Sequence, residues 1–106
     1  MERERDLERY LRRKVEVAGG LALKFTSPEN DGVPDRLVIL PGGKTIFVEL
    51  KAPKGRLSSL QRWQQSRLTR RGCEVRTVWT REQVDSILRE QEGGKEGQNQ
   101  GASCWE

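Results

Sequence analysis

Apolar residues recur at helical spacing near the start of the chain. Within residues 3–18 they are spaced i, i+4, i+8 and i+11, and they are Leu7, Leu11, Val15 and Ala18. Arginines and Lys14 occupy the opposite side of the same segment. This pattern predicts an amphipathic helix with one face against a core. Gly19 and Gly20 follow it, and glycine is a common helix terminator.

Short apolar runs bounded by turn formers predict three strands in the middle of the chain, over residues 21–25, 35–40 and 45–51. A loop of residues 26–34, rich in turn formers, separates the first strand from the second. The connector Pro41-Gly42-Gly43-Lys44 joins the second strand to the third, and its glycines are typical of a tight hairpin.

The second half of the chain begins with a basic loop over residues 52–57. Ser58 or Ser59 can then cap a helix that runs to about Arg71 and ends at Gly72. Residues 73–79 resemble a fourth strand. Thr80 and Gln83 form a capping box for a last helix, whose inward residues are Val84, Ile87 and Leu88.

The resulting order is α-β-β-β-α-β-α. It predicts an α/β domain over residues 1–91, with a mixed four-stranded sheet flanked by helices, because a hairpin gives antiparallel pairs and a helical crossover gives a parallel one. Residues 92–106 contain mostly Gly, Gln, Asn and Glu, so we expect a flexible, disordered tail there.

Composition narrows the possible chemistry. The 106 residues suffice for one domain, and 33% hydrophobic against 34% charged residues is typical of a soluble protein. No apolar run approaches the roughly 20 residues of a membrane span, and the charged N-terminus has no signal-peptide core, so we expect a cytoplasmic protein without membrane contact.

The chain has no histidine, which excludes Ser-His-Asp and Cys-His catalysis and imidazole metal sites.

Cys73 and Cys104 are too few and too far apart for a zinc site or a disulfide framework. Any catalysis must therefore use carboxylates, lysine and backbone groups, with or without a hard metal ion. The net charge is +4, and residues 1–91 alone hold 19 basic and 13 acidic residues, or +6. Such a domain suits a polyanionic partner, although the same charge serves solubility equally well.

Three polar residues are expected to converge in the central hairpin. Side chains alternate along a strand, so Glu49 and Lys51 share one side, about 6–7 Å apart. Asp35 begins the preceding strand and lies beside the end of its antiparallel partner. Asp35 and Glu49, with the Leu50 carbonyl between them, can hold Mg²⁺ or Mn²⁺. Lys51 can orient the attacking water or stabilise a pentacoordinate phosphate. A surface ion pair between strand neighbours would use the same residues.

Two segments of the chain together resemble the PD-(D/E)xK nuclease signature in the form used by VRR-NUC domains. They are Gly32-Val33-Pro34-Asp35-Arg36 and Glu49-Leu50-Lys51. The resemblance extends over residues 3 to about 90. It includes the first helix, the ALKF strand at 22–25 and the LSxxQ run at 57–61. The chain looks like the compact stand-alone version found in bacteriophages, which is related to the nuclease module of the Fanconi-associated nuclease.

The resemblance implies an αβββαβ restriction-endonuclease-like core and a Mg²⁺- or Mn²⁺-dependent DNA endonuclease. Stand-alone members are described as homodimers that act on branched DNA such as four-way junctions, so the same is implied here. The family's first-helix glutamate, which completes the metal site, falls on Glu4, with Glu8 as the second choice. Either glutamate would also suit a helix N-terminus simply because of the helix dipole.

The family's glutamine after the lysine falls on Gln61, where it would position Lys51 or the scissile phosphate. It could equally be an ordinary polar residue of a first helical turn, and Gln64 is close enough to be confused with it. Lys24, Lys54 and Arg56 are candidates for contacts with the DNA backbone, and plain solvation explains them as well. We expect Phe47, Trp63 and Trp79 to be core residues rather than base-stacking platforms.

Two other functions fit parts of the pattern. A nucleic-acid-binding module without cleavage activity would use the same basic face, but Asp35 and Glu49 would repel phosphates unless a cation neutralised them. A protein-interaction accessory in phage packaging or replication would need none of these residues to contact DNA.

Overall fold

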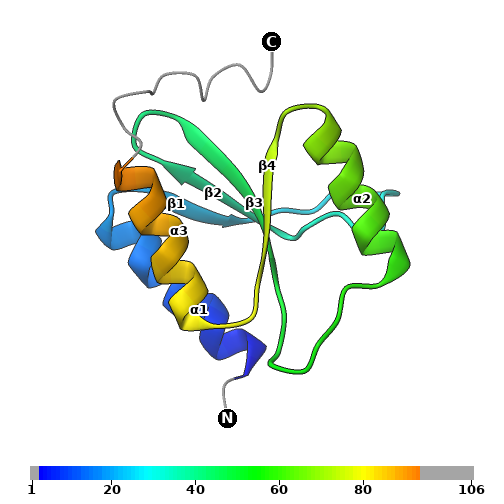
Figure 1. The fold of residues 1–106 in the computed structure, drawn as a ribbon, viewed down its shortest axis with the longest axis horizontal. Coiled ribbons are helices and arrows are strands. Elements are labelled where there is room, and N and C mark those ends of the chain that lie inside the picture. The colour runs from blue at the N-terminus through cyan, green and yellow to red at the C-terminus, as the bar shows by residue number, and fades with distance from the viewer. Residues whose placement is uncertain (1–2, 94–106) are drawn as a thin grey trace.

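The chain adopts the predicted order of helices and strands in a computed structural model, which describes residues 3–93 (Figure 1). Every boundary lies within two residues of the prediction. The elements are α1 (Glu4–Val17), β1 (Leu21–Lys24), β2 (Arg36–Leu40), β3 (Lys44–Leu50), α2 (Ser59–Arg70), β4 (Glu74–Val78) and α3 (Arg81–Gly93). The disordered tail predicted for residues 92–106 falls almost wholly outside the described residues, and α3 includes its first two.

The four strands form one mixed sheet in the order β1-β2-β3-β4. The pairs β1–β2 and β2–β3 are antiparallel, and β3–β4 is parallel. In the hairpin, Arg36 pairs with Val48 and Leu40 with Lys44. Helix α2 is the crossover between the two parallel strands. The predicted fold class is confirmed.

Helices α1 and α3 cover one face of the sheet, and α2 lies on the other (Figure 1). The main core lies on the α1/α3 side; its buried members are Leu7, Leu11, Val15, Val38, Leu40, Ile46, Val48, Leu50, Val78, Val84 and Ile87. Because side chains alternate along a strand, β3 directs Ile46, Val48 and Leu50 into this core and turns Glu49 toward α2. The alternation thus decides which sheet face carries the polar residues.

The start of α2 is held by a capping box. The Ser58 hydroxyl accepts a hydrogen bond from the Gln61 N–H (3.0 Å), and the Gln61 side-chain carbonyl accepts one from the Ser58 N–H (2.9 Å). The loop before β2 packs against this helix at Gly32, where φ is +89° and a Cβ atom would come within 2.8 Å of Leu60. Only glycine satisfies both the backbone conformation and the close approach.

The aromatic residues divide into two groups. Phe47 packs edge-on against Phe25, with ring centroids 5.7 Å apart. The Trp79 indole N–H donates to the Gly55 carbonyl (2.8 Å). Phe47 and Trp79 are half-buried, and neither belongs to the main core that was predicted for them. The prediction for Trp63 was wrong, since it is 52% exposed. The sheet-facing positions of α2 are taken by Gln61, Gln64 and Leu68, which leaves Trp63 on the outer side.

Within residues 3–93, none of the helices combines the length and the apolar character that crossing a membrane requires.

Candidate active site

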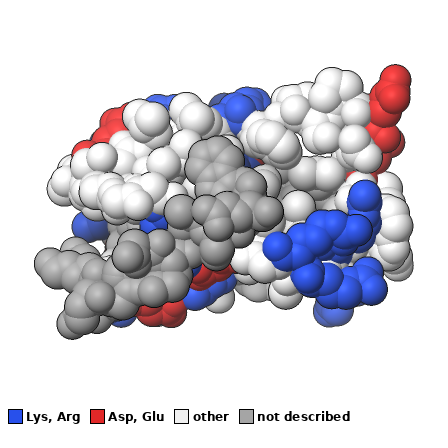
Figure 2. Space-filling model, turned by 90° about the horizontal axis from the view of Figure 1, so that it is seen from above, with Lys and Arg blue, Asp and Glu red and all other residues white. Residues whose placement is uncertain are grey.

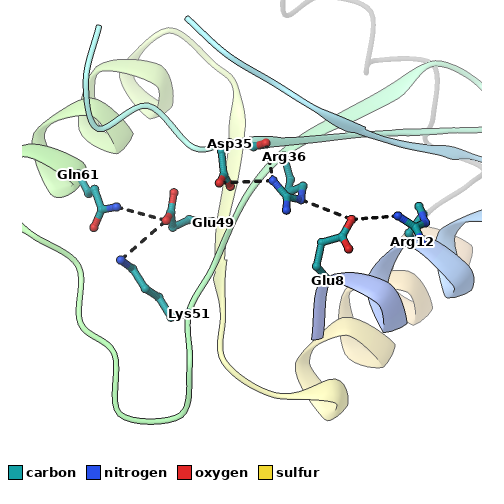
Figure 3. Close-up of polar contacts among 7 residues, drawn as sticks. All are labelled: Glu8, Arg12, Asp35, Arg36, Glu49, Lys51 and Gln61. Carbon is teal, nitrogen blue, oxygen red and sulfur yellow. Dashed lines mark hydrogen bonds and ion pairs between the residues drawn. The ribbon is translucent and has the colours of Figure 1, made fainter. Parts of the chain in front are cut away.

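Asp35 and Glu49 face each other across the β2–β3 hairpin. Continuing the register by one residue from the Arg36–Val48 pair sets Asp35 opposite Glu49. Residues directly opposite in an antiparallel pair share a face, with Cβ atoms about 4.5–5.5 Å apart. The Glu49 residue is only 7% exposed, whereas the Asp35 side chain is 47% exposed. The two carboxylates therefore form one site that opens to solvent through Asp35 (Figure 3).

Lys51 and Gln61 converge on the Glu49 carboxylate from two elements. The Lys51 Nζ lies 3.8 Å from Glu49 Oε2, and the Gln61 Nε2 donates to the same oxygen over 3.2 Å (Figure 3). Lys51 lies just beyond the end of β3, but its N–H donates to the Val78 carbonyl (2.9 Å). That bond prolongs the ladder with β4, so the alternation continues and keeps Lys51 on the same face as Glu49.

Negative charge is crowded around Glu49. Its pKa is raised from 4.5 to about 7, first by burial and then by the Asp35 carboxylate. Lys51 and Arg36 oppose this increase, while Glu4 adds to it. A carboxylate in this position gains from a nearby cation, because a positive charge would offset both the burial and the repulsion by Asp35.

The Leu50 carbonyl is the third oxygen that was predicted for the site. The N–H of Lys51 points toward β4, and backbone groups of successive residues point in opposite directions, so those of Leu50 point toward β2. If the hairpin register continued two residues beyond the Arg36–Val48 pair, Pro34 would lie opposite Leu50. Proline has no N–H, so it could not donate to the Leu50 carbonyl, which makes this oxygen a candidate metal ligand.

Asp35, Glu49 and the Leu50 carbonyl make an all-oxygen donor set, which fits a hard divalent cation such as Mg²⁺ or Mn²⁺. In the part of the chain that the structure describes, no group of three or more His, Cys, Asp or Glu side chains is arranged to hold a metal ion. Two carboxylates and one carbonyl leave room in an octahedral shell for water and a phosphate oxygen.

The two candidate glutamates of α1 have different surroundings. Glu4 is exposed, and its charge is one of those that raise the pKa of Glu49. Glu8 instead lies 3.7 Å from Arg36 Nε and 3.4 Å from Arg12 Nη1 (Figure 3). Glu4 is therefore electrostatically coupled to the site, whereas Glu8 is engaged by two arginines.

Arg36 is a residue of the site that the sequence reasoning did not single out. Its Nη1 lies 3.3 Å from Asp35 Oδ2 and donates to the Asp35 carbonyl. Its side chain is only 13% exposed, and it connects Asp35 with Glu8 on α1. A signal was present in the pattern: Arg36 precedes Val38 and Leu40 on the core-facing side of β2, where a charge needs partners.

The remaining candidates lie elsewhere. Gln64 is buried and donates to the Asp31 carbonyl (2.9 Å), so it fastens the loop before β2 and does not reach Glu49.

Lys24 is exposed at the end of the edge strand β1 and pairs in register with Arg36, on the face opposite to Glu49. Lys54 and Arg56 are exposed in the loop before α2. Within residues 3–93, none of these three basic residues has an ion-pair partner.

Known proteins are similar to this chain in sequence and in fold. The sequence model of the VRR-NUC domain matches residues 6–82. A protein of Acyrthosiphon pisum secondary endosymbiont phage 1, named "Putative nuclease p44", is 45% identical over 86 residues, which cover 81% of this chain and 91% of that protein. A solved structure described as a VRR_NUC domain superposes with a TM-score of 0.76 at 33% identity. It covers 81% of this chain and 94% of the other.

Proposed function

The chain belongs to the VRR-NUC domain family, and from this premise we propose that it is an endonuclease that hydrolyses DNA phosphodiester bonds with Mg²⁺ or Mn²⁺. The observation that carries the proposal is the convergence of two carboxylates and a lysine, Asp35, Glu49 and Lys51, on one sheet face. Asp35, Glu49 and the Leu50 carbonyl would hold the metal ion, and Glu4 would complete the site from α1.

When bound, such an ion polarises a phosphoryl oxygen and lowers the pKa of a coordinated water. Lys51 and Gln61 would act beside the ion. Lys51, 3.8 Å from Glu49, places a positive charge where it can orient the attacking water or stabilise the charge of a pentacoordinate phosphate. Gln61 holds the Glu49 carboxylate through a hydrogen bond, so that one oxygen keeps a constant orientation toward the site.

Branched DNA, such as a four-way junction, is the proposed substrate, and a homodimer is the proposed assembly. The charge of +6 on residues 1–91 supports binding to a polyanion. A chain of 106 residues offers little surface for two duplex arms, and two copies related by symmetry would provide more. Lys24, Lys54 and Arg56 would contact the backbone of the arms. The similarity to a phage protein agrees with action in the cytoplasm of a bacterial host.

The proposal is tested by incubating the full chain with a labelled four-way junction and with a linear duplex of the same sequence. Each is supplied with Mg²⁺, Mn²⁺ or EDTA, and the products are separated on a denaturing gel. Cleavage with either metal, and none with EDTA or in Lys51→Ala, is expected. Binding without cleavage under every condition would instead support a non-catalytic module. Light scattering on the same preparation measures the oligomeric state.

A further inference from the structure

Helix α2 exposes an aromatic residue and arginines on its outer side. Trp63 is 52% exposed. Arg67 and Arg70 follow it at i+4 and i+7, so all three lie along one side of the helix. Arg71, which caps the helix, is exposed beside them. We refer to Trp63, Arg67, Arg70 and Arg71 as the α2 stripe.

The α2 stripe is strongly basic. The helix sequence SLQRWQQSRLTR contains no acidic residue, and Arg62 adds a further exposed positive charge. Seen from above, basic side chains gather on the side of the molecule where α2 lies (Figure 2). A surface of this charge is complementary to a phosphate backbone.

Contacts within the protein hold Trp63 and Arg67, the central residues of the α2 stripe, in place. The Arg67 guanidinium lies over the Trp63 ring, 4.8 Å from its centroid, and its Nη1 donates to Gln64 Oε1 (3.0 Å). Gln64 is itself buried and bonded to Asp31. Arg67 and Arg71 also line a hollow of about 220 Å³ together with Phe25 and Phe47. Arg67 is therefore held between the Trp63 ring and the hollow.

Helix α2 also starts at the candidate active site. Gln61, in its first turn, donates to Glu49, and Trp63 follows two residues later. With a rise of 1.5 Å per residue, the segment from Gln61 to Arg70 extends about 13 Å. A strand of duplex DNA advances about 3.4 Å per nucleotide, so the stripe matches about four nucleotides of a strand that leaves the site.

We infer that the α2 stripe binds the DNA strand next to the scissile phosphate and that Trp63 stacks on an unpaired base of that strand. The inference rests on the proposed DNA substrate. In a duplex the faces of the bases are covered by their neighbours, so an exposed indole ring finds a stacking partner only where the strand is unpaired or splayed. The arginines contact phosphates in either form of DNA. Trp63 therefore provides selectivity for unpaired nucleotides, and the arginines provide general affinity.

The test measures binding without divalent metal, so that it does not depend on cleavage. A fluorescent forked DNA and a fully paired duplex of equal length are titrated with the full chain in EDTA. The variants are Trp63→Ala, Trp63→Phe and Arg70→Gln. Arg13→Gln is the matched control, because Arg13 is an exposed arginine of α1, on the other side of the sheet. Melting curves establish that each variant is folded.

Trp63→Ala is expected to weaken binding of the fork about tenfold and binding of the duplex less than about twofold, because the indole ring stacks only on an unpaired base. Trp63→Phe should retain most of the fork affinity. Arg70→Gln should weaken both DNAs and lower the salt dependence by about one ion, and Arg13→Gln should change neither.

Two results would overturn the inference. One is an equal effect of Trp63→Ala on fork and duplex, or no effect on either. The other is conversion of a dimer to a monomer by Trp63→Ala, which would make the stripe an interface between two copies of the chain. If the wild-type chain binds the fork selectively through Trp63 but does not cleave with Mg²⁺ or Mn²⁺, the proposed nuclease function fails, while the assignment of the α2 stripe as a surface that binds unpaired DNA stands.

Discussion

Gln61 links the start of α2 to Glu49. Its Nε2 donates to Glu49 Oε2 over 3.2 Å, and its Oε1 accepts from the Ser58 N–H over 2.9 Å. The same side chain thus completes the helix cap and holds a carboxylate of the candidate site. The two contacts use different ends of the amide, so a substitution can remove one and keep the other.

Gln61→Glu keeps an acceptor for Ser58 but replaces the donor to Glu49 with a like charge. We expect the helical circular dichroism to be retained, because a carboxylate suits a helix N-terminus. We expect the cleavage rate to fall at least about tenfold. The matched control is Gln65→Glu, which makes the same change of charge in α2 beside Thr77 instead of Glu49. Equal losses of activity in the two variants would show that Gln61 has no specific role.

Lys51→Ala removes the positive charge beside Glu49. Cleavage should fall by about 100-fold or more, because a charge aimed at the developing negative charge acts mainly in the transition state. The affinity for DNA should change less than about threefold, as measured by fluorescence anisotropy. Lys14→Ala, in α1 on the other side of the sheet, serves as control and should retain cleavage. An unfolded Lys51→Ala protein would make this lysine structural.

Asp35→Asn and Glu49→Gln each remove a carboxylate from the proposed metal site. Calorimetric titration with Mn²⁺ should show at least about a tenfold loss of affinity in either variant, because amide oxygens are weaker ligands for hard cations. Asp31→Asn, in the preceding loop, should bind Mn²⁺ like the wild type. Unchanged Mn²⁺ affinity in the first two variants would contradict the assigned ligands.

The raised pKa of Glu49 predicts how the stability of the folded chain depends on pH. Its pKa is about 7 in the folded chain and 4.5 ordinarily, so between these values the folded state holds more protons than the unfolded state. Without metal, stability should therefore be highest at or below about pH 4.5 with respect to this group, and fall as pH rises toward 7, by on the order of 3 kcal/mol. The chain has no histidine to titrate in this range.

The measurement is the melting temperature in EDTA between pH 5 and 8. Glu49→Gln should flatten its decline, and added Mn²⁺ should stabilise the wild type more at pH 8 than at pH 5, since metal and proton compete for the same carboxylate. A decline of the same size in Glu49→Gln would assign the pH dependence to other groups.

Glu4 and Glu8 can be separated by parallel substitutions. Glu4→Gln should weaken Mn²⁺ binding and lower the pKa of Glu49, because the Glu4 charge contributes to raising that pKa. Glu8→Gln breaks the contacts with Arg36 and Arg12 and should lower the stability by up to about 1 kcal/mol, with Mn²⁺ affinity retained. The reverse outcome would assign the metal-site role to Glu8.

Local patterns were sufficient for most of the fold. The spacing of Leu7, Leu11 and Val15 predicted α1, and the glycines at 42 and 43 predicted the β2–β3 hairpin. These signals are short-range, because a helix face and a tight turn depend on residues only a few positions apart. Alternation along β3 similarly predicted that Glu49 and Lys51 share a face, and the 3.8 Å separation of their charged groups agrees.

Trp63 shows where such patterns were insufficient. A tryptophan in a helix is buried or exposed according to which helix face meets the sheet, and α2 turns Gln61 and Gln64 inward. The reason is tertiary: Gln64 bonds to the Asp31 carbonyl and Gln61 to Glu49. Polar residues thus occupy the inner side of α2, and the apolar ring is displaced outward.

The sequence by itself determined the elements, their order and the set of residues available for chemistry, since periodicity, caps and turns are local properties of the chain. The tertiary structure alone decided that Arg36 connects Asp35 with Glu8 and that Trp63 lies on the outer side of α2. Each of these depends on the register between strands or on the rotation of a helix against a sheet. Contacts between residues distant in sequence set that register and that rotation, and no local pattern contains them.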